Sequence, residues 1–418
     1  MKKQKFARLL IYFMVFALVA LTGCSNAAPS NVAAPINKEV NENVDFDALV
    51  AQAKGTTVTF YGWGGDELRN KWLDTAVAST LKTKYDITLK RVPMDIDQIL
   101  SQLSGEKQAG KEEGSIDMIW INGENFFSAK ENGFLYGSFT DKLPNYDKYI
   151  DQNAEENQYD FGYPIEGYEA PYGKAQMVLI NDSAVTPETP KNTEELLAYA
   201  KKYPGKVTYP ALPDFTGSAF VRTIIYDIVG YEQFMTMEAD KETVKAAILP
   251  ALEYLQELNP YLWNKGKTFP ATSSQVENMF ADGELVMNMS YGPYSVATKI
   301  AEGAYPETAR TFLFDKGTVG NTNYIAIAAN SPNKAGAMVA INEIISAELQ
   351  ASQFSELKSL PVVAYEKLTA EEKAKFDSVD TGKGTLPQNE LLAKRLPEMP
   401  AKLVPIIEEI WLEEVVGK

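Results

Sequence analysis

The stretch TVTFYGWGGDELRNKWLDTAVASTLKTKYDITLKRV, residues 57–92, decides the fold class. It begins with β-branched and aromatic residues, passes through a glycine-rich turn and a helical segment, and ends in a second strand pattern at 87–92. A helical segment at 95–108 and a third strand pattern at 116–121 repeat the alternation. Strands that alternate with helices predict a parallel sheet with helices on both faces, so we expect an α/β fold.

The rest of the chain continues the alternation, with two long extended segments at 168–180 and 317–327 that interrupt it. The segment 402–416 places its apolar residues near one face and predicts a docked amphipathic helix. The other expected elements are strands at 206–210 and 285–290, and helices at 45–54, 243–258, 276–281 and 334–347, with one more opening at 214.

The N-terminus has the pattern of an export signal. Basic residues precede an apolar run from Leu9 to Leu21, and this run is about 13 residues long, too short for the roughly 20 that span a bilayer. The ending Leu21-Thr22-Gly23-Cys24 resembles the bacterial lipobox, which implies that Cys24 carries acyl chains such as palmitate and anchors the protein outside the cell membrane or in the periplasm. The alternative is an ordinary cleaved signal followed by a chance cysteine.

The composition excludes several classes of function. The formal charge is −16, and it becomes more negative once the basic signal is removed, so the surface repels nucleic acid and anionic lipid. The sequence has no histidine, which rules out Ser-His-Asp and Cys-His catalysis and His-ligated metal sites. Cys24 is the single cysteine, so no disulfide is available, and a lipidated Cys24 is no nucleophile.

About 390 residues remain after the signal, more than one hydrophobic core usually supports, so we expect two lobes. The expected division is a signal peptide at 1–23, a flexible tether at 24–44, the first part of lobe 1 at 45–170, lobe 2 at 171–318, a return to lobe 1 at 319–360, and C-terminal helices packed on the lobes at 361–418.

The order of these segments resembles a known superfamily. The chain is similar to ABC-transporter solute-binding proteins of type II topology. It shares with them an export signal, an α/β lobe, a crossing strand near 168–180, a second lobe, and a second crossing strand near 317. A helix entry, Asn330-Ser331-Pro332-Asn333-Lys334, follows that second crossing strand. The resemblance implies two doubly wound α/β lobes joined by two crossing strands, with a ligand cleft between them. It also implies a permease and an ATPase subunit as partners, and it does not identify the ligand.

More narrowly, the chain resembles the YnjB-type binding proteins, from about residue 50 to 345 and more weakly toward the C-terminus. The segments that carry this resemblance are Trp63-Gly64-Gly65-Asp66, Trp120-Ile121-Asn122-Gly123-Glu124-Asn125-Phe126, Tyr209-Pro210, Pro213-Asp214-Phe215-Thr216-Gly217 and Pro260-Tyr261-Leu262-Trp263.

Ligands of doubly wound sheets bind beyond the carboxyl ends of the strands, so the loops there hold the candidate residues. Trp63 and Gly64 follow the first strand, where glycines let backbone N–H groups approach a ligand. Asn122 and Glu124 follow the third strand. Both loops could equally be helix caps with solvated side chains.

The second lobe offers a matching set. Asp214 and Thr216 open a helix and could contact the ligand or only cap that helix. Tyr291 and Tyr294 flank a Gly-Pro turn and could stack on a ligand, or one of them could be a core residue. The other two candidates lie on the crossing segments, where a structural role in the hinge is an equal alternative: Tyr172 and Asn323.

These candidates predict a binding protein that closes on a small solute. No Lys or Arg stands in these loops except Lys174, which argues against a strongly anionic solute and favours a neutral hydroxylated compound or an organic cation. We expect no cofactor, no metal, no nucleic acid and a monomer. Iron ligation by Tyr291 and Tyr294 would need added carboxylates and an anion.

The first rival function is an extracytoplasmic hydrolase or transferase that uses Glu124 and Asp214 on the same fold. A thiaminase-like enzyme would need a cysteine in the cleft, and the sequence provides none there. A surface adhesin or structural lipoprotein is the second rival, and the two α/β lobes argue against it.

Overall fold

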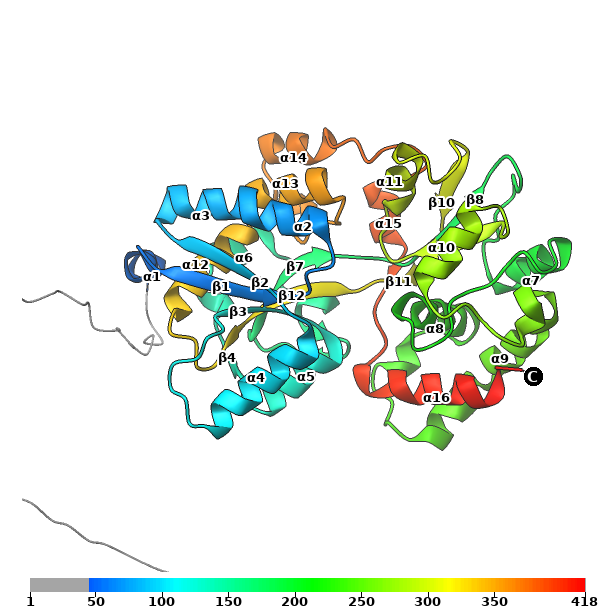
Figure 1. The fold of residues 1–418 in the computed structure, drawn as a ribbon, viewed down its shortest axis with the longest axis horizontal. Helices are drawn as coiled ribbons and strands as arrows, with labels where there is room; N and C mark the ends of the chain where they lie inside the picture. Colours follow the sequence, from blue (N-terminus) through cyan, green and yellow to red (C-terminus); the bar gives the residue numbers. More distant parts are fainter. Residues whose placement is uncertain (1–44, 418) are drawn as a thin grey trace, which may run out of the picture. The chain divides into compact units, whose positions relative to one another are not determined.

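The computed structural model describes residues 45–417 of the chain (Figure 1). The predicted signal peptide, Cys24 and the whole of the predicted tether lie outside these residues. Within the described part of the chain, none of the helices is both long and apolar enough to span a membrane.

A six-stranded sheet with helices on both faces forms lobe 1. The strand order is β2-β1-β3-β12-β4, and β7 also pairs with β12. β1 is parallel to β2 and β3, whereas β12 is antiparallel to its three neighbours. The strands are β1 (Thr57–Gly62), β2 (Thr88–Pro93), β3 (Met118–Ile121), β4 (Leu135–Tyr136), β7 (Glu169–Lys174) and β12 (Thr322–Ala328).

Alternating side chains of this sheet face two separate cores, as the pleat of a strand requires. Phe60 and Met118 pack under α1, α2, α3 and α12, whereas Tyr61 and Ile119 pack under α4 and α5. The helices are α1 (Phe46–Ala53), α2 (Glu67–Trp72), α3 (Ala78–Tyr85), α4 (Ile96–Gln108), α5 (Gly123–Glu131), α6 (Pro144–Tyr149), α12 (Lys334–Ile344), α13 (Ala347–Leu357) and α14 (Ala370–Asp377). A π-helical turn, Leu73–Val77, joins α2 to α3.

Lobe 2 is built on a smaller sheet. β8 lies between β9 and β10 and is antiparallel to both. The strands are β8 (Val178–Asp182), β9 (Met287–Ser290) and β10 (Ala309–Phe312); the helices are α7 (Thr193–Lys202), α8 (Phe215–Val229), α9 (Lys241–Leu258), α10 (Ser273–Ala281), α11 (Ser295–Ala301), α15 (Gln388–Ala393) and α16 (Val404–Glu414). The α/β class with two lobes is confirmed, although this sheet is antiparallel and not parallel.

The strand expected at 206–210 is wrong, because the segment is extended without joining a sheet. Its backbone receives single hydrogen bonds from Trp263 N–H to Val207 O and from Val286 N–H to Lys206 O. Tyr209 is fully buried, with its ring centroid 4.8 Å from that of Phe220. The strand-like composition therefore reflects burial, not a strand ladder.

Within the residues that the structure describes, the chain passes between the lobes three times. Residues 175–177 join β7 to β8, and residues 320–321 join β11 (Thr318–Val319) to β12. A third passage runs from α14 to α15 (Figure 1), where Thr311 N–H donates to Gly384 O at 2.7 Å. The sequence did not indicate this third passage. The expected domain boundaries remain a prediction, and strand pairing carries lobe 1 as far as Lys174.

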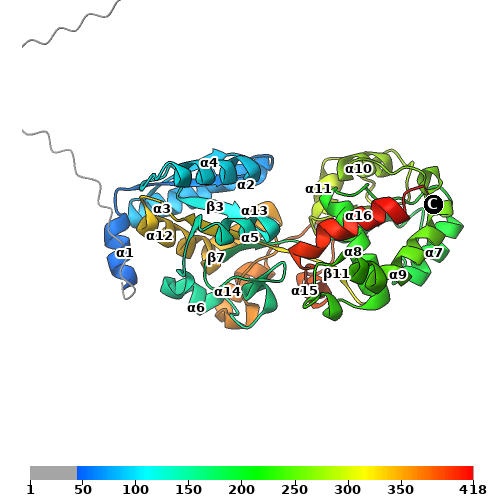
Figure 2. The same cartoon turned by 90° about the horizontal axis from the view of Figure 1, so that it is seen from below.

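The docked C-terminal helix is confirmed. Ile407, Ile410 and Trp411 of α16 are buried in the core of lobe 2, and Figure 2 shows α16 lying along α8 and α9. The segment before α16 forms β13 (Arg395–Leu396), which pairs in parallel with β11. This segment places Arg395 and Glu398 beside the crossing strands.

Candidate functional site

The loop after β1 forms one wall of the site. Asp66 caps α2, because its Oδ1 accepts from the backbone N–H of Arg69 at 3.0 Å. Trp63 stands out from this loop and is 57% exposed. A side chain at Gly64 would place its Cβ 2.5 Å from the Cβ of Pro93, so close packing against β2 explains this glycine.

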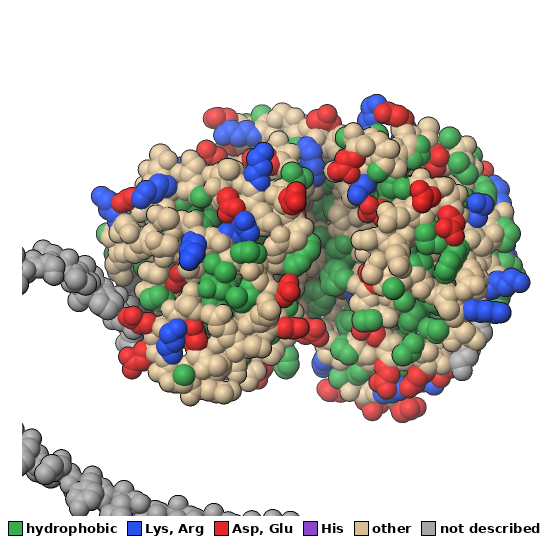
Figure 3. All heavy atoms as spheres, in the orientation of Figure 1, with side chains coloured by type: hydrophobic (Ala, Val, Ile, Leu, Met, Phe, Trp, Pro, Cys, Tyr) green, Lys and Arg blue, Asp and Glu red, His purple; other side chains and the backbone are tan. Residues whose placement is uncertain are grey.

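A cavity of about 760 Å³ lies between the lobes, beyond the carboxyl ends of β1 and β3. Figure 3 shows the surface hollowed between the two lobes. Lobe 1 contributes Trp63, Arg69 and Trp120, and lobe 2 contributes Phe215 and Tyr291. Both lobes therefore supply aromatic side chains to one shared space.

Four of the predicted binding residues line this cavity: Trp63, Asn122, Asn323 and Tyr291. Asn122 Nδ2 donates to Asn323 Oδ1 at 2.8 Å, which joins the loop after β3 to the second crossing segment. The Tyr291 ring lies 4.7 Å from that of Phe215, and its hydroxyl donates to Glu398. Ligand contact by these four residues remains a prediction.

The other predicted residues lie elsewhere. Tyr172 is fully buried beneath Arg69, because alternation along β7 directs its side chain into a core. Tyr294 is buried against Phe354 of α13. Asp214 caps α8 by accepting from the N–H groups of Thr216 and Gly217 at 3.0 Å, and Thr216 is buried beside it.

Glu124 does not line the main cavity either, because the segment predicted to be a polar turn is helical. α5 begins at Gly123, so Glu124 lies in its first turn. It lines a separate cavity of about 310 Å³, which shares Asn122 and Phe215 with the larger one. Glu124 therefore faces the interlobe region without lining the main cavity, and Gly64 does not line it either.

The wall of the main cavity contains a guanidinium that the loop analysis missed. Arg69 Cζ lies 5.2 Å from the ring centroid of Trp120 and 5.4 Å from that of Tyr172, and the side chain is 14% exposed. Burial lowers the pKa of Arg69, but Tyr172 and Asp66 raise it by more, so the net pKa is raised and the group stays cationic. The prediction counted basic residues in the strand-end loops alone, where Lys174 stands, and Arg69 and Lys358 add two further cations to the cavity wall from outside those loops.

Lys174 and Arg395 form an ion cluster with Glu156 at the crossing strands. Lys174 Nζ lies 2.9 Å and Arg395 Nη1 3.7 Å from Glu156 Oε1. Burial raises the pKa of Glu156, but the two cations lower it by more, to about 2. Glu156 therefore stays ionised and ties lobe 1 to the C-terminal segment.

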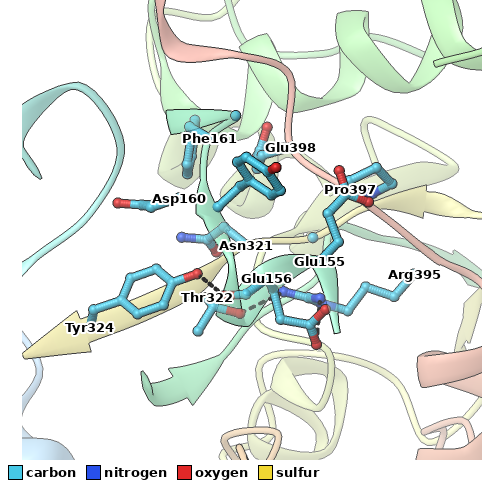
Figure 4. Close-up of a pocket in the computed structure, with 13 residues that line it drawn as sticks. Glu155, Glu156, Asp160, Phe161, Asn321, Thr322, Tyr324, Arg395, Pro397 and Glu398 are labelled. Carbon is cyan, nitrogen blue, oxygen red and sulfur yellow. Dashed lines mark hydrogen bonds and ion pairs between the residues drawn. The ribbon is translucent and has the colours of Figure 1, made fainter. Parts of the chain in front are cut away.

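A smaller cavity of about 100 Å³ lies beside this cluster (Figure 4), and Asn321 lines both it and the main cavity. Figure 4 shows the Glu156 carboxylate facing the Arg395 guanidinium. Behind the wall, Asp160 and Glu169 are almost wholly buried. Burial raises the pKa of both carboxyls well above the usual range, and for Glu169 the nearby Asp160 raises it further.

A buried ion pair supports the lobe 2 wall. Arg222 Nε lies 3.1 Å and Nη2 3.2 Å from the two carboxylate oxygens of Glu398, and both side chains are at most 3% exposed. Arg222 Nη1 also donates to Ser218 Oγ at 2.5 Å. Because Tyr291 bonds to the same carboxylate, this pair fixes the orientation of an aromatic residue of the cavity.

Arg69 and Phe215 are two of the lining residues that sequence reasoning missed. Arg69 lies within α2, one turn beyond the glycine loop, and its spacing from Asp66 is the signal that could have found it. Phe215 is the first residue of α8, and its side chain is 49% exposed. The signal available in the sequence was an aromatic residue directly after the helix-capping Asp214.

A family model for bacterial extracellular solute-binding proteins matches residues 76–376. The chain belongs to this family. Protein YnjB of Escherichia coli (strain K12) is 36% identical over 308 residues, which cover 73% of this chain and 79% of YnjB. Both the solute-binding family and the YnjB resemblance predicted from the sequence are confirmed.

Solved structures share the fold of this solute-binding protein. An ABC transporter from Clostridium perfringens ATCC 13124 gives a TM-score of 0.61 at 20% identity, covering 85% of this chain and 98% of that one. An ABC transporter substrate-binding protein from Bradyrhizobium japonicum USDA 110 gives 0.61 at 17% identity, covering 86% and 99%. Family membership implies an exported protein, a small-molecule ligand and a permease partner.

Proposed function

We propose that the chain is a monomeric, lipid-anchored receptor that captures a polar organic solute in the interlobe cavity and delivers it to an ABC permease. The observation that carries this proposal is the cavity of about 760 Å³ whose walls come from both lobes. Pockets for small ligands are concave, mostly apolar, and hold a few placed polar groups. Trp63 and Phe215 provide the apolar part here, and Asn122 and Asn323 provide polar groups.

Closure of the two lobes is the proposed mechanism. A solute that contacts both walls binds the closed state more tightly than the open state and so shifts the population toward closure. The crossing segments at 175–177 and 320–321 absorb the change in backbone angles. The Glu156 ion cluster lies at these segments and keeps the floor of the cavity in place.

The test begins with the solute that copurifies from the native host, identified by mass spectrometry after denaturation. Its rebinding to stripped protein should reduce the radius of gyration measured by small-angle X-ray scattering. Trp63→Ala should weaken this binding about tenfold, because an aromatic contact contributes about 1 kcal/mol beyond its buried area. Phe127→Ala removes an exposed aromatic of lobe 1 outside the cavity and is the matched control. Solute turnover, or binding without compaction, would contradict the proposal.

Lipid anchoring is tested separately at Cys24. Cys24→Ala should move the protein from the membrane fraction to the soluble extracytoplasmic fraction, because a buried acyl chain contributes about 0.8 kcal/mol per CH₂ group. Mass spectrometry of the wild-type N-terminal peptide should show a diacylglyceryl cysteine. Ser25→Ala is the control and should stay with the membrane. An unmodified Cys24, or membrane retention of Cys24→Ala, would show that no lipid holds the protein.

A further inference from the structure

The two terminal amino groups of Arg69 are hydrogen-bond donors that could bind a carboxylate of the solute. The Nε–H of Arg69 donates to Asp66 Oδ2 at 3.2 Å. Among the described residues, the two terminal amino groups of Arg69 make no hydrogen bond to a carboxylate. These terminal groups form the planar fork that matches a carboxylate with two parallel hydrogen bonds. Tyr172 also interacts with the Arg69 side chain from the buried side, and because Arg69 lines the cavity a bound solute can reach the guanidinium.

The position of Arg69 is fixed before any solute arrives. The guanidinium lies against the rings of Trp120 and Tyr172, which contact each other edge to face, and Asp66 bonds to its Nε side. A group held in this way loses little side-chain entropy when it binds, so more of the interaction energy appears as affinity. Partial burial also strengthens a charged hydrogen bond relative to one in water.

The surroundings restrict the anion to a single charge and an apolar body. Asp66 compensates part of the Arg69 charge and Glu156 pairs with Lys174, while Lys358 and Asp95 add one charge of each sign to the lining, so a dianionic phosphate would meet little net positive charge. Trp63, Trp120 and Phe215 supply aromatic faces in the same space.

We propose that Arg69 binds the carboxylate of the solute, and that the solute is an organic monocarboxylate with an aromatic or other flat apolar body. This inference rests on the proposed function, because it names the solute class of the same cavity. It also assigns to Arg69, a residue outside the strand-end loops, the role of selecting the charge of the solute.

The experiment uses three probes of one shape: phenylacetate, its neutral amide phenylacetamide, and phenyl phosphate. Dissociation constants for the mature chain are measured by saturation-transfer NMR titration. The variants are Arg69→Met, which keeps an apolar stem, and Arg69→Lys, which keeps the charge and loses the fork. Arg91→Met is the matched control, because Arg91 pairs with Asp74 on the same lobe and lies outside the cavity.

Wild type should bind phenylacetate about tenfold or more tightly than phenylacetamide, since a charged hydrogen bond to a partly buried group is worth about 1.5–3 kcal/mol. Arg69→Met should abolish this preference, Arg69→Lys should restore part of it, and Arg91→Met should leave it unchanged. Unfolding midpoints of all variants check that each one folds.

Equal binding of acid and amide, absence of binding by all three probes, tighter binding of phenyl phosphate, or a preference that survives Arg69→Met would overturn the inference. The copurifying solute shows whether the inference about Arg69 alone is wrong or the proposed receptor function is wrong as well. A neutral or cationic solute that closes the lobes leaves the receptor function standing and removes the role of Arg69. Absence of both a copurifying solute and compaction would contradict the receptor function itself.

Discussion

Replacement of Arg222 by Met should lower the free energy of unfolding by about 3–5 kcal/mol, because it leaves Glu398 as an uncompensated buried carboxylate. Arg222 and Glu398 are joined by two hydrogen bonds inside lobe 2, and Arg222 also bonds to Ser218. Met fills the space of the arginine stem but cannot neutralise Glu398. Urea denaturation followed by tryptophan fluorescence measures the loss.

Two controls separate charge from packing. Lys201→Met breaks the exposed pair with Glu257 and should change stability by no more than about 0.5 kcal/mol. The double variant Arg222→Met/Glu398→Gln removes both charges and should recover part of the stability lost in the single variant. A double variant as unstable as Arg222→Met would mean that packing, not the unpaired charge, causes the loss.

The second large effect is a gain in the free energy of unfolding. Glu169→Gln should stabilise the protein at neutral pH by at most about 3 kcal/mol, the cost of protonating on folding a carboxyl whose pKa in the unfolded chain is about 4.5. Glu169 is fully buried, and neither carboxyl oxygen has a hydrogen-bond partner among residues 45–417. Burial and the nearby Asp160 raise its pKa well above 4.5. Glutamine keeps the shape of the side chain and cannot ionise.

The pH dependence follows from the direction of that shift. The folded protein keeps a proton on Glu169 at pH values where the unfolded chain has released it, so wild-type stability falls as pH rises from about 4.5 toward the folded pKa. The advantage of Glu169→Gln should therefore be small near pH 4 and grow toward pH 8 in urea denaturation. Glu366→Gln alters an exposed carboxylate and is the control. If the stability gained by Glu169→Gln did not change with pH, the raised pKa of Glu169 would be contradicted.

The first lobe could be predicted closely because its signals are local. The strand patterns at 57–61, 87–92 and 116–121 and the helices between them correspond to β1, β2, β3, α2, α3 and α4. The second lobe was harder to predict from the sequence. Residues 206–210 have the composition of a strand because Tyr209 is buried, and no local pattern shows whether a neighbouring strand is available. The third passage depends on where α14 and α15 pack, which is a long-range property.

Prediction of the cavity residues depended on which face of an element a side chain occupies. Trp63 and Asn122 follow strands whose carboxyl ends meet at one edge of a sheet, so their placement was predictable. Tyr172 and Tyr294 are aromatic residues in the right segments with side chains turned into packed interiors. Arg69 was missed because the search was limited to loops, whereas a helix also presents its first turns to the same edge.

The contribution of α16 to the core of lobe 2 has a consequence for how the protein matures. Apolar side chains of residues 403–415 complete that core, whereas β12, which completes the sheet of lobe 1, ends at Ala328. An exported chain emerges N-terminal end first, so lobe 1 gains its full sheet while much of lobe 2 still lacks its final helix. We therefore expect lobe 2 to reach its native packing only after residues 403–415 have crossed the membrane, and binding to follow as the last step of maturation.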